Sequence, residues 1–264
     1  MIEELSKNLF EAEAKDTHAG SDRICRESLI KFIKDLRFAL FSNYFCEDFS
    51  RENLLFFLSA SYADIKEALG ERFEQQKEKI DSFYSGLLKL REKLMLDVEA
   101  LFEGDPASSD YEEIITAYPG FTAIYCHRVA HEFYLMGMRR LARIISEYAH
   151  SRTGIDINPG AKIGDSFFID HGTGIVIGET AVIGNHCKIY QGVTLGALSL
   201  RNGRKLTGMK RHPTLLDNVV IYSGASIFGG ETVIGNNVIV GSNVEIKESV
   251  PDNTIVRGNV GKRD

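Results

Sequence analysis

The stretch 169–196 reads IDHGTGIVIGETAVIGNHCKIYQGVTLG, and small aliphatic residues recur in it every six positions. The period continues on both sides, and the residues that carry it are Ile157, Ile163, Ile169, Ile177, Ile183, Ile189, Leu195, Ile221, Ile227, Val233 and Ile239. An α-helix repeats every 3.6 residues and a β-strand every two, so neither produces this spacing. A period of six predicts a parallel β-helix, in which six residues form one side and three sides form one coil. At roughly 4.8 Å per coil, about four coils would build a prism about 20 Å tall.

Two interruptions of the period mark the places where function is expected. An eight-residue step follows Ile169, so the segment 170–174 is expected to bulge from its coil. A step of 26 residues follows Leu195, so a long loop is expected to leave the prism and to end near Arg211-His212-Pro213. Excursions of this kind often carry function on a regular scaffold.

Composition divides the chain near residue 154. Of the 24 glycines, 18 lie from Gly154 onward, whereas the earlier part carries apolar stripes at helical spacing. We therefore expect an α+β protein with three parts. These are an α-helical assembly domain over 1–153, of which 105–153 packs onto the prism, a β-helix domain over 154–258, and a short tail over 259–264.

The helical part is expected to consist of several helices. Their ranges are 28–45, 54–69, 73–102, 111–117, 121–134 and 136–151, with Gly70 and Gly104 as stops, Pro106 in the first turn of a helix and a break at Pro119-Gly120. His127 and His131 share one helix face. A packed or surface histidine pair is favoured over metal ligands there, because no third, carboxylate ligand is evident.

Composition and charge exclude several classes of protein. No apolar run approaches the ~20 residues that a membrane span needs, and the acidic N-terminus lacks the pattern of a signal peptide. The four cysteines form no CxxC pair, as expected for free thiols in a reducing cytoplasm. A net charge of −6 argues against a nucleic-acid partner.

The bulge carries the strongest candidate for catalysis, His171. Glycines flank it, and Asp156 lies 15 residues earlier, nearly one coil below. Stacking should bring this carboxylate within reach of the imidazole. A carboxylate behind an imidazole fixes its tautomer and stabilises the imidazolium, which suits a general base acting on a hydroxyl.

The long loop offers further candidates. Between Ser199 and His212 it holds five cations and no acid, namely Arg201, Arg204, Lys205, Lys210 and Arg211. Such a run is either a solvated loop or a site for an anionic cofactor or a substrate carboxylate. A metal site of His171, His186 and His212 is a weaker alternative, because His186 falls at a regular corner.

Several short motifs are specific enough to indicate a family. They are Asp105-Pro106-Ala107, Asp156-Ile157-Asn158-Pro159, the run from Asp170 to Ile183, the run from Gln191 to Gly196, and Arg211-His212-Pro213. Together they resemble serine O-acetyltransferase, a branch of the hexapeptide-repeat acyltransferases that acetylates the hydroxyl of L-serine with acetyl-CoA in cysteine biosynthesis. The resemblance covers about residues 105–258.

The resemblance implies a role for individual residues. His171 would be the general base and Asp156 would orient it; Asp105 and Asp170 would hold the substrate ammonium, and Arg211 and His212 its carboxylate. Acetyl-CoA would contact the chain near Gly196, Ala197, Ser223, Gly224 and Gly241. No metal would be needed, because the thioester is already activated.

The resemblance also implies partners. It predicts a left-handed prism, a homotrimer or a dimer of trimers with active sites between subunits, and feedback inhibition by L-cysteine. The chain departs from the family pattern at Asn158, where histidine is usual, and in its longer and more basic loop over 198–212. Its ending, Gly261-Lys262-Arg263-Asp264, lacks the usual terminal isoleucine, so a complex with cysteine synthase is expected to be weak or absent.

Three other functions stay open on the sequence alone. They are an acetyltransferase of the same fold acting on another small hydroxyl acceptor, a scaffold without catalysis, and a metal-dependent hydratase. The groups expected to hold an ammonium and a carboxylate, which we call the amino-acid clamp, argue against the first, because other acceptors such as sugars lack those charges. The presence of both Asp156 and His171 argues against the second. The residues of the clamp are Asp105, Asp170, Arg211 and His212.

Overall fold

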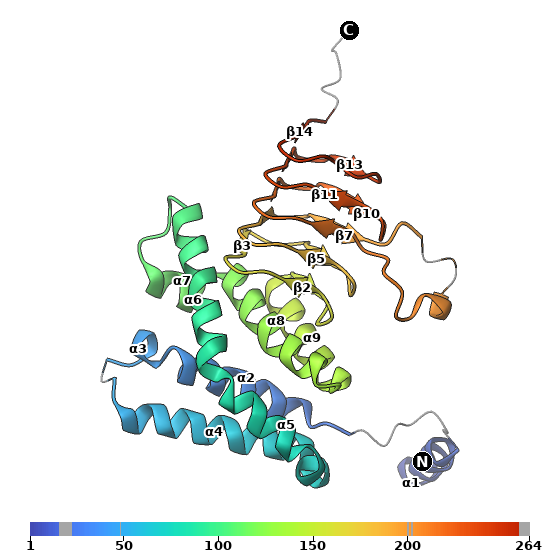
Figure 1. Cartoon of the computed structure of the whole chain (residues 1–264). Helices are drawn as coiled ribbons and strands as arrows, with labels where there is room; N and C mark the ends of the chain where they lie inside the picture. The colour runs from blue at the N-terminus through green and yellow to red at the C-terminus, as the bar shows by residue number, and fades with distance from the viewer. Residues whose placement is uncertain (16–22, 48, 200, 202, 259–264) are drawn as a thin grey trace.

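The computed structural model describes residues 1–15, 23–47, 49–199, 201 and 203–258, so the expected tail 259–264 lies outside it. A helical region precedes a stack of short parallel strands (Figure 1). Its helices are α1 (Ile2–Ala14), α2 (Arg26–Leu40), α3 (Ser42–Phe45), α4 (Arg51–Leu69), α5 (Phe73–Ser85), α6 (Leu87–Gly104), α7 (Tyr111–Ala117), α8 (Pro119–Leu135) and α9 (Arg139–Thr153), with a 3₁₀ turn at Gly70–Arg72. In the described ranges, no helix is long and apolar enough to cross a membrane.

The helix boundaries differ from the expected ones, and three of the differences have a bearing on how the chain is divided. Gly86 separates α5 from α6, which were expected as one helix. Pro119 begins α8 instead of breaking the chain, as suits its missing N–H. The segment after Gly104 is a turn and not a helix, because the Asp105 carboxylate accepts the N–H of Ala107 and so competes with helical hydrogen bonds.

The strands confirm the expected fold class, an α-helical region followed by a left-handed parallel β-helix. Sheet A consists of β1 (Asp156–Ile157), β4 (Val176–Ile177), β7 (Thr194–Gly196), β10 (Ser226–Phe228) and β13 (Glu245–Ile246). Sheet B consists of β2 (Lys162–Ile163), β5 (Val182–Ile183), β8 (Thr214–Leu215) and β11 (Val233–Ile234). Sheet C consists of β3 (Phe168–Asp170), β6 (Lys188–Tyr190), β9 (Val220–Ile221), β12 (Ile239–Val240) and β14 (Ile255–Val256). The stack has about five coils instead of four, because the repeat continues past the last expected position at Ile239.

Register in the upper coils corrects part of the expected pattern. Ile234 and Val240 are fully buried there, whereas Val233 is 36% exposed and Ile239 is half-buried. Val233 and Ile239 were therefore wrong as core residues. The physical reason is one extra residue near Gly229, whose φ of +105° is open to glycine alone, and a shift of one residue exchanges the two faces of a strand.

A buried ion pair joins the helices to the first coil. The Nε of Arg128 on α8 lies 2.5 Å from Oδ2 of Asp97 on α6, and both side chains are at most 4% exposed. Arg128 also donates to the carbonyls of Ile163 and Gly164, at 3.3 and 2.8 Å. Asp97 in turn accepts the N–H of Phe167 at 2.9 Å. These two side chains thus fix α6 and α8 against the corner between β2 and β3.

Candidate active site

The first group of candidates lies where sheet C turns into sheet A, which we call the C–A corner (residues 171–175, 191–193, 222–225 and 241–244). His171 begins it, with a φ of +55°, and its ring is 69% exposed. Its Nδ1 lies 3.4 Å from Oδ1 of Asp170. The expected bulge is confirmed, since Val176 pairs with Asp156, 20 residues earlier, whereas Thr194 pairs with Val176 after 18.

Asp105 reaches the same corner from the helical region. Gly104 packs so closely on Phe168 that an added Cβ would lie 2.3 Å from that ring, which brings the following turn against the end of β3. The Tyr118 hydroxyl donates to Oδ2 of Asp105 at 2.7 Å, and this bond with the Ala107 N–H lowers the pKa of Asp105. The nearby His171 contributes to the same shift. Asp105 and Asp170 therefore present two carboxylates beside the exposed imidazole.

Asp156 is the one predicted catalytic residue for which the structure gives no contact with His171. It lies on β1, paired with Val176, and among the described residues no hydrogen bond joins it to His171. Its role as the orienting carboxylate stays a prediction.

The second group of candidates lies where sheet A turns into sheet B, the A–B corner (residues 158–161, 178–181, 197–199, 201, 203–213, 229–232 and 247–250). Arg211 Nη2 lies 2.5 Å from Oε2 of Glu179, whose Oε1 accepts the Tyr134 hydroxyl at 3.0 Å. The guanidinium lowers the pKa of Glu179 by this hydrogen bond. Glu179 and Tyr134 therefore hold the Arg211 side chain in place at the root of the long loop.

His212 is the neighbouring side chain, and its tautomer follows from its contacts. The Thr180 N–H points at its Nδ1 over 3.1 Å, so this nitrogen accepts and the neutral ring carries its proton on Nε2. Burial, with the charges of Arg211 and Lys210, lowers the pKa of His212 to about 4. The ring is thus neutral at pH 7 and offers one N–H donor beside the Arg211 guanidinium.

A glycine makes room for this ring. An added Cβ at Gly178 would lie 2.0 Å from Cδ2 of His212, far inside van der Waals contact. We expect Gly178→Ala to displace the ring into water, so the pKa of His212 should rise from about 4 toward the ordinary value of about 6.5. Histidine NMR over a pH series measures this. Gly86→Ala, where the nearest atom is 3.4 Å away, is the control, and an unchanged His212 titration in Gly178→Ala would contradict the assignment.

The expected acetyl-CoA positions divide between the same two corners. Ser223, Gly224 and Gly241 lie on the C–A corner above His171, where the Ser223 hydroxyl bonds to Ser242 over 3.2 Å. Gly196 and Ala197 lie at the far end of β7, where the long loop leaves for the A–B corner.

Glycines keep the C–A corner flat above the imidazole. Gly174, Gly192 and Gly224 stack on one another with φ near +75°, so no side chain stands between neighbouring coils there. These three glycines, which we call the glycine track, run along the prism from His171 and end below Asn243, whose Oδ1 would lie 2.3 Å from a Cβ at Gly224.

Sequence reasoning missed three residues of these groups, Tyr118, Glu179 and Thr180. The Thr180 hydroxyl accepts the N–H groups of both Arg211 and His212, at 2.9 and 3.1 Å. A signal for Glu179 was available, because it is the single acid between residues 171 and 216, a range that contains the cationic loop. Lys210 of that loop is also tied down, since its Nζ donates to the Thr180 carbonyl at 2.7 Å.

His127 and His186 do not join these groups. His186 lies on the corner between sheets B and C, and His127 is buried under the prism. Within the described ranges, no three His, Cys, Asp or Glu side chains gather as metal ligands would. The expectation that the reaction needs no metal stays a prediction.

Comparison with known proteins gives one consistent result. No protein-family model matches the chain. A curated relative, the plasmid serine acetyltransferase of Synechococcus elongatus, is 41% identical over 227 residues, which cover 76% of this chain and 71% of the relative.

Solved structures agree with the curated relative. Serine acetyltransferase isoform 3 of Entamoeba histolytica, in complex with cysteine, superposes with a TM-score of 0.80 at 39% identity and covers 88% of this chain and 83% of its own. Serine acetyltransferase 1 of the same organism, in complex with L-cysteine, gives 0.79 at 34% identity, with 96% and 97% covered.

Proposed function

Because this chain belongs to the serine acetyltransferase family, we propose that it acetylates L-serine with acetyl-CoA at a site that two copies of the chain build together. Membership confirms the resemblance seen in the motifs, and with it an acyltransferase that acts on serine. One observation carries the proposal of a shared site. The base and the two carboxylates lie on the C–A corner, whereas the carboxylate-binding groups lie on the A–B corner of the same coils.

The two corners suit the two ends of an amino acid. Asp105 and Asp170 offer negative charge to an ammonium, and Arg211 with the Nε2–H of His212 offers donors to a carboxylate. Sheet A separates the corners within one chain. When three prisms pack around an axis parallel to their own, the C–A corner of one meets the A–B corner of the next, and one serine spans both.

The proposed reaction is a direct acyl transfer. His171 takes the proton from the serine hydroxyl while that oxygen attacks the thioester carbonyl carbon. The tetrahedral intermediate then collapses, the carbon–sulfur bond breaks, and the imidazolium returns its proton to the leaving thiolate of CoA. Charge balances at every step, so the base starts and ends neutral.

Acetyl-CoA is proposed to lie along the glycine track of the C–A corner. Because Gly174, Gly192 and Gly224 carry no side chains, the extended pantetheine arm can lie against their backbone. The arm would run from Ser223 and Gly241 toward His171. Gly196 and Ala197 would face the same arm from the neighbouring copy. The track thus aims the thioester at the base.

L-cysteine is proposed as an inhibitor at the serine position. It presents the same ammonium and carboxylate as serine, with a thiol in place of the hydroxyl, so both halves of the clamp accept it. The neighbouring Entamoeba structures were solved with cysteine, which supports this proposal.

Pairing of trimers is proposed to involve the helical region. Leu55, Phe56 and Leu88 are each at least 64% exposed there, which is costly for apolar side chains in a solitary trimer.

Mixing two inactive variants tests the shared site. His171→Asn removes the base and Arg211→Met removes a clamp residue, so each homotrimer should release little CoA thiol from acetyl-CoA and L-serine. Heterotrimers formed by refolding or coexpressing both should regain activity, because some interfaces then join an intact C–A corner to an intact A–B corner. Homotrimers mixed without subunit exchange serve as the control. If exchange restores nothing, each site belongs to a single chain.

A further inference from the structure

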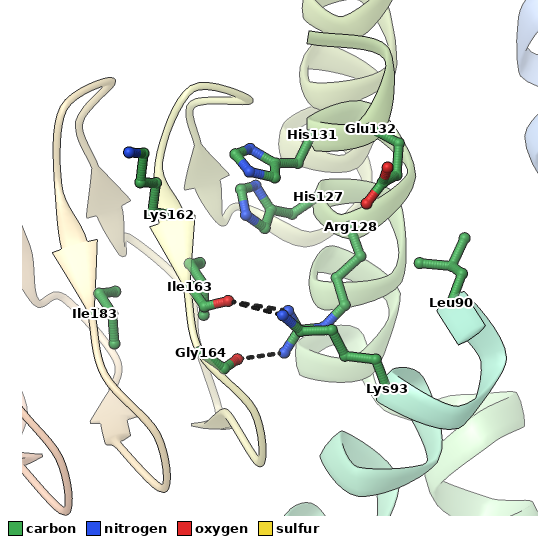
Figure 2. Close-up of a pocket in the computed structure, with 10 residues that line it drawn as sticks. All are labelled: Leu90, Lys93, His127, Arg128, His131, Glu132, Lys162, Ile163, Gly164 and Ile183. Atoms are coloured by element: carbon green, nitrogen blue, oxygen red, sulfur yellow. Dashed lines mark hydrogen bonds between the residues drawn. The ribbon is translucent and has the colours of Figure 1, made fainter. Parts of the chain in front are cut away.

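A cavity of about 350 Å³ lies between the helices and the first coils on the side of sheet B, and no residue of the proposed active site lines it. Its wall carries five basic groups and one acid, which are Lys93, His127, Arg128, His131, Lys162 and Glu132. Figure 2 shows the rings of His127 and His131 extending from α8 toward the strands, with Lys162 on β2 beyond them. The surplus of basic groups favours an anion over a metal cation.

The two imidazoles have definite hydrogen-bonding needs. His131 Nδ1 lies 2.7 Å from the Pro159 carbonyl, which only accepts, so Nδ1 carries the proton and Nε2 of the neutral ring is an acceptor. His127 is 3% exposed, and its Nδ1 has no hydrogen-bond partner in the described part of the chain. Burial lowers the pKa of both rings, and Lys93 and Arg128 add to the effect. An occupant of the cavity therefore meets two neutral rings.

The cations differ in what they can still bind. Arg128 is committed to Asp97 and to backbone carbonyls. Lys93 pairs with Asp165 at 3.1 Å and reaches the Ile163 carbonyl at 3.3 Å. Lys162 is exposed and forms no ion pair among the residues that the structure describes. The ammonium left for a ligand is therefore that of Lys162.

We propose that this cavity binds a hydrogen phosphate group, either as free phosphate or as the head of a small phosphate monoester. Its P–OH donates to Nε2 of His131, and its charged oxygens accept from the His127 ring and from Lys162. Sulfate has the same shape, but it carries no proton at neutral pH. It leaves the His131 acceptor unpaired and should bind less tightly.

Calorimetric titration of the full-length protein at about pH 6, where about half of a phosphate monoester carries a proton, tests this. The probes are inorganic phosphate, glycerol 3-phosphate and sulfate. We expect saturable binding of at least one phosphate probe and weaker binding of sulfate. The tighter of the two phosphate probes identifies the source of the group.

Two variants connect the binding to the cavity. Lys162→Met, at an exposed position, should weaken phosphate binding about tenfold. Lys247→Met on the upper coils is the matched control and should bind as the parent does. Side-chain NMR of His127 and His131 should shift with the same dissociation constant. No saturable binding by either phosphate probe, sulfate binding as tight as phosphate, or equal losses in both lysine variants would overturn the proposal.

Discussion

His171→Asn should lower kcat for serine acetylation by about 10²- to 10⁴-fold, the usual contribution of a positioned general base. Asparagine is chosen because His171 has a φ of +55°, a conformation that asparagine tolerates and alanine does not favour. The corner should therefore keep its shape while losing its base. Release of CoA thiol from acetyl-CoA and L-serine measures the rate.

His186→Asn is the matched control for this variant. His186 is also exposed at a corner of the prism, with a φ of +56°, so the same substitution has the same backbone cost there. It should leave kcat unchanged. A His171→Asn enzyme within a few-fold of the parent rate would remove the imidazole from the proposed mechanism.

Asp97→Ala should lower the free energy of unfolding by about 3–5 kcal/mol, because it leaves the Arg128 guanidinium buried without its counter-charge. It also removes the acceptor of the Phe167 N–H. Burial raises the pKa of Asp97, while Arg128 opposes that shift, so the carboxylate depends on its partner. Urea unfolding at a fixed protein concentration measures the loss.

Asp165→Ala provides the comparison for this loss. Its carboxylate pairs with Lys93, yet both side chains are more than a third exposed, so the expected cost is about 0–1 kcal/mol. If Asp97→Ala costs no more than Asp165→Ala, the buried pair is not what joins the helices to the first coil.

Much of the prism could be predicted from the sequence, because each inward residue repeats at a fixed interval and the pattern needs no distant information. The prediction failed at Val233 and Ile239, where a single extra residue near Gly229 changes the register without breaking the apolar pattern, since both faces there carry branched residues. Only the exposed fraction of each side chain in the structure shows which of the two faces is turned inward. The start of α8 at Pro119 did have a local signal, because proline suits the first turn of a helix, although a break was expected there.

The candidate site was predicted in its parts, but its arrangement was not. His171 and Arg211 each sit on an interruption of the repeat, which is a local signal. The pairing of the coils places them on different corners. Glu179, the partner of Arg211, and Tyr118, the partner of Asp105, come from segments that the repeat spacing does not relate to them. For Glu179 the sequence offered one signal, because it is the single acidic residue between residues 171 and 216, the range that contains the cationic loop.

Among the residues that the structure describes, helices cover the coil stack at one end only. α9 contacts β1 and α8 contacts β3, whereas β14, whose Ile255 is 56% exposed, pairs within that described part with β12 alone. In a stack where each coil contacts only the next, opening begins at the uncovered end and travels inward. Amide exchange should therefore be slowest in the coil that carries His171, fastest in β14, and next fastest around Gly241, whose N–H bonds to the Val256 carbonyl. In the proposed mechanism, the base therefore lies in a coil that opens late, and acetyl-CoA meets coils that open earlier.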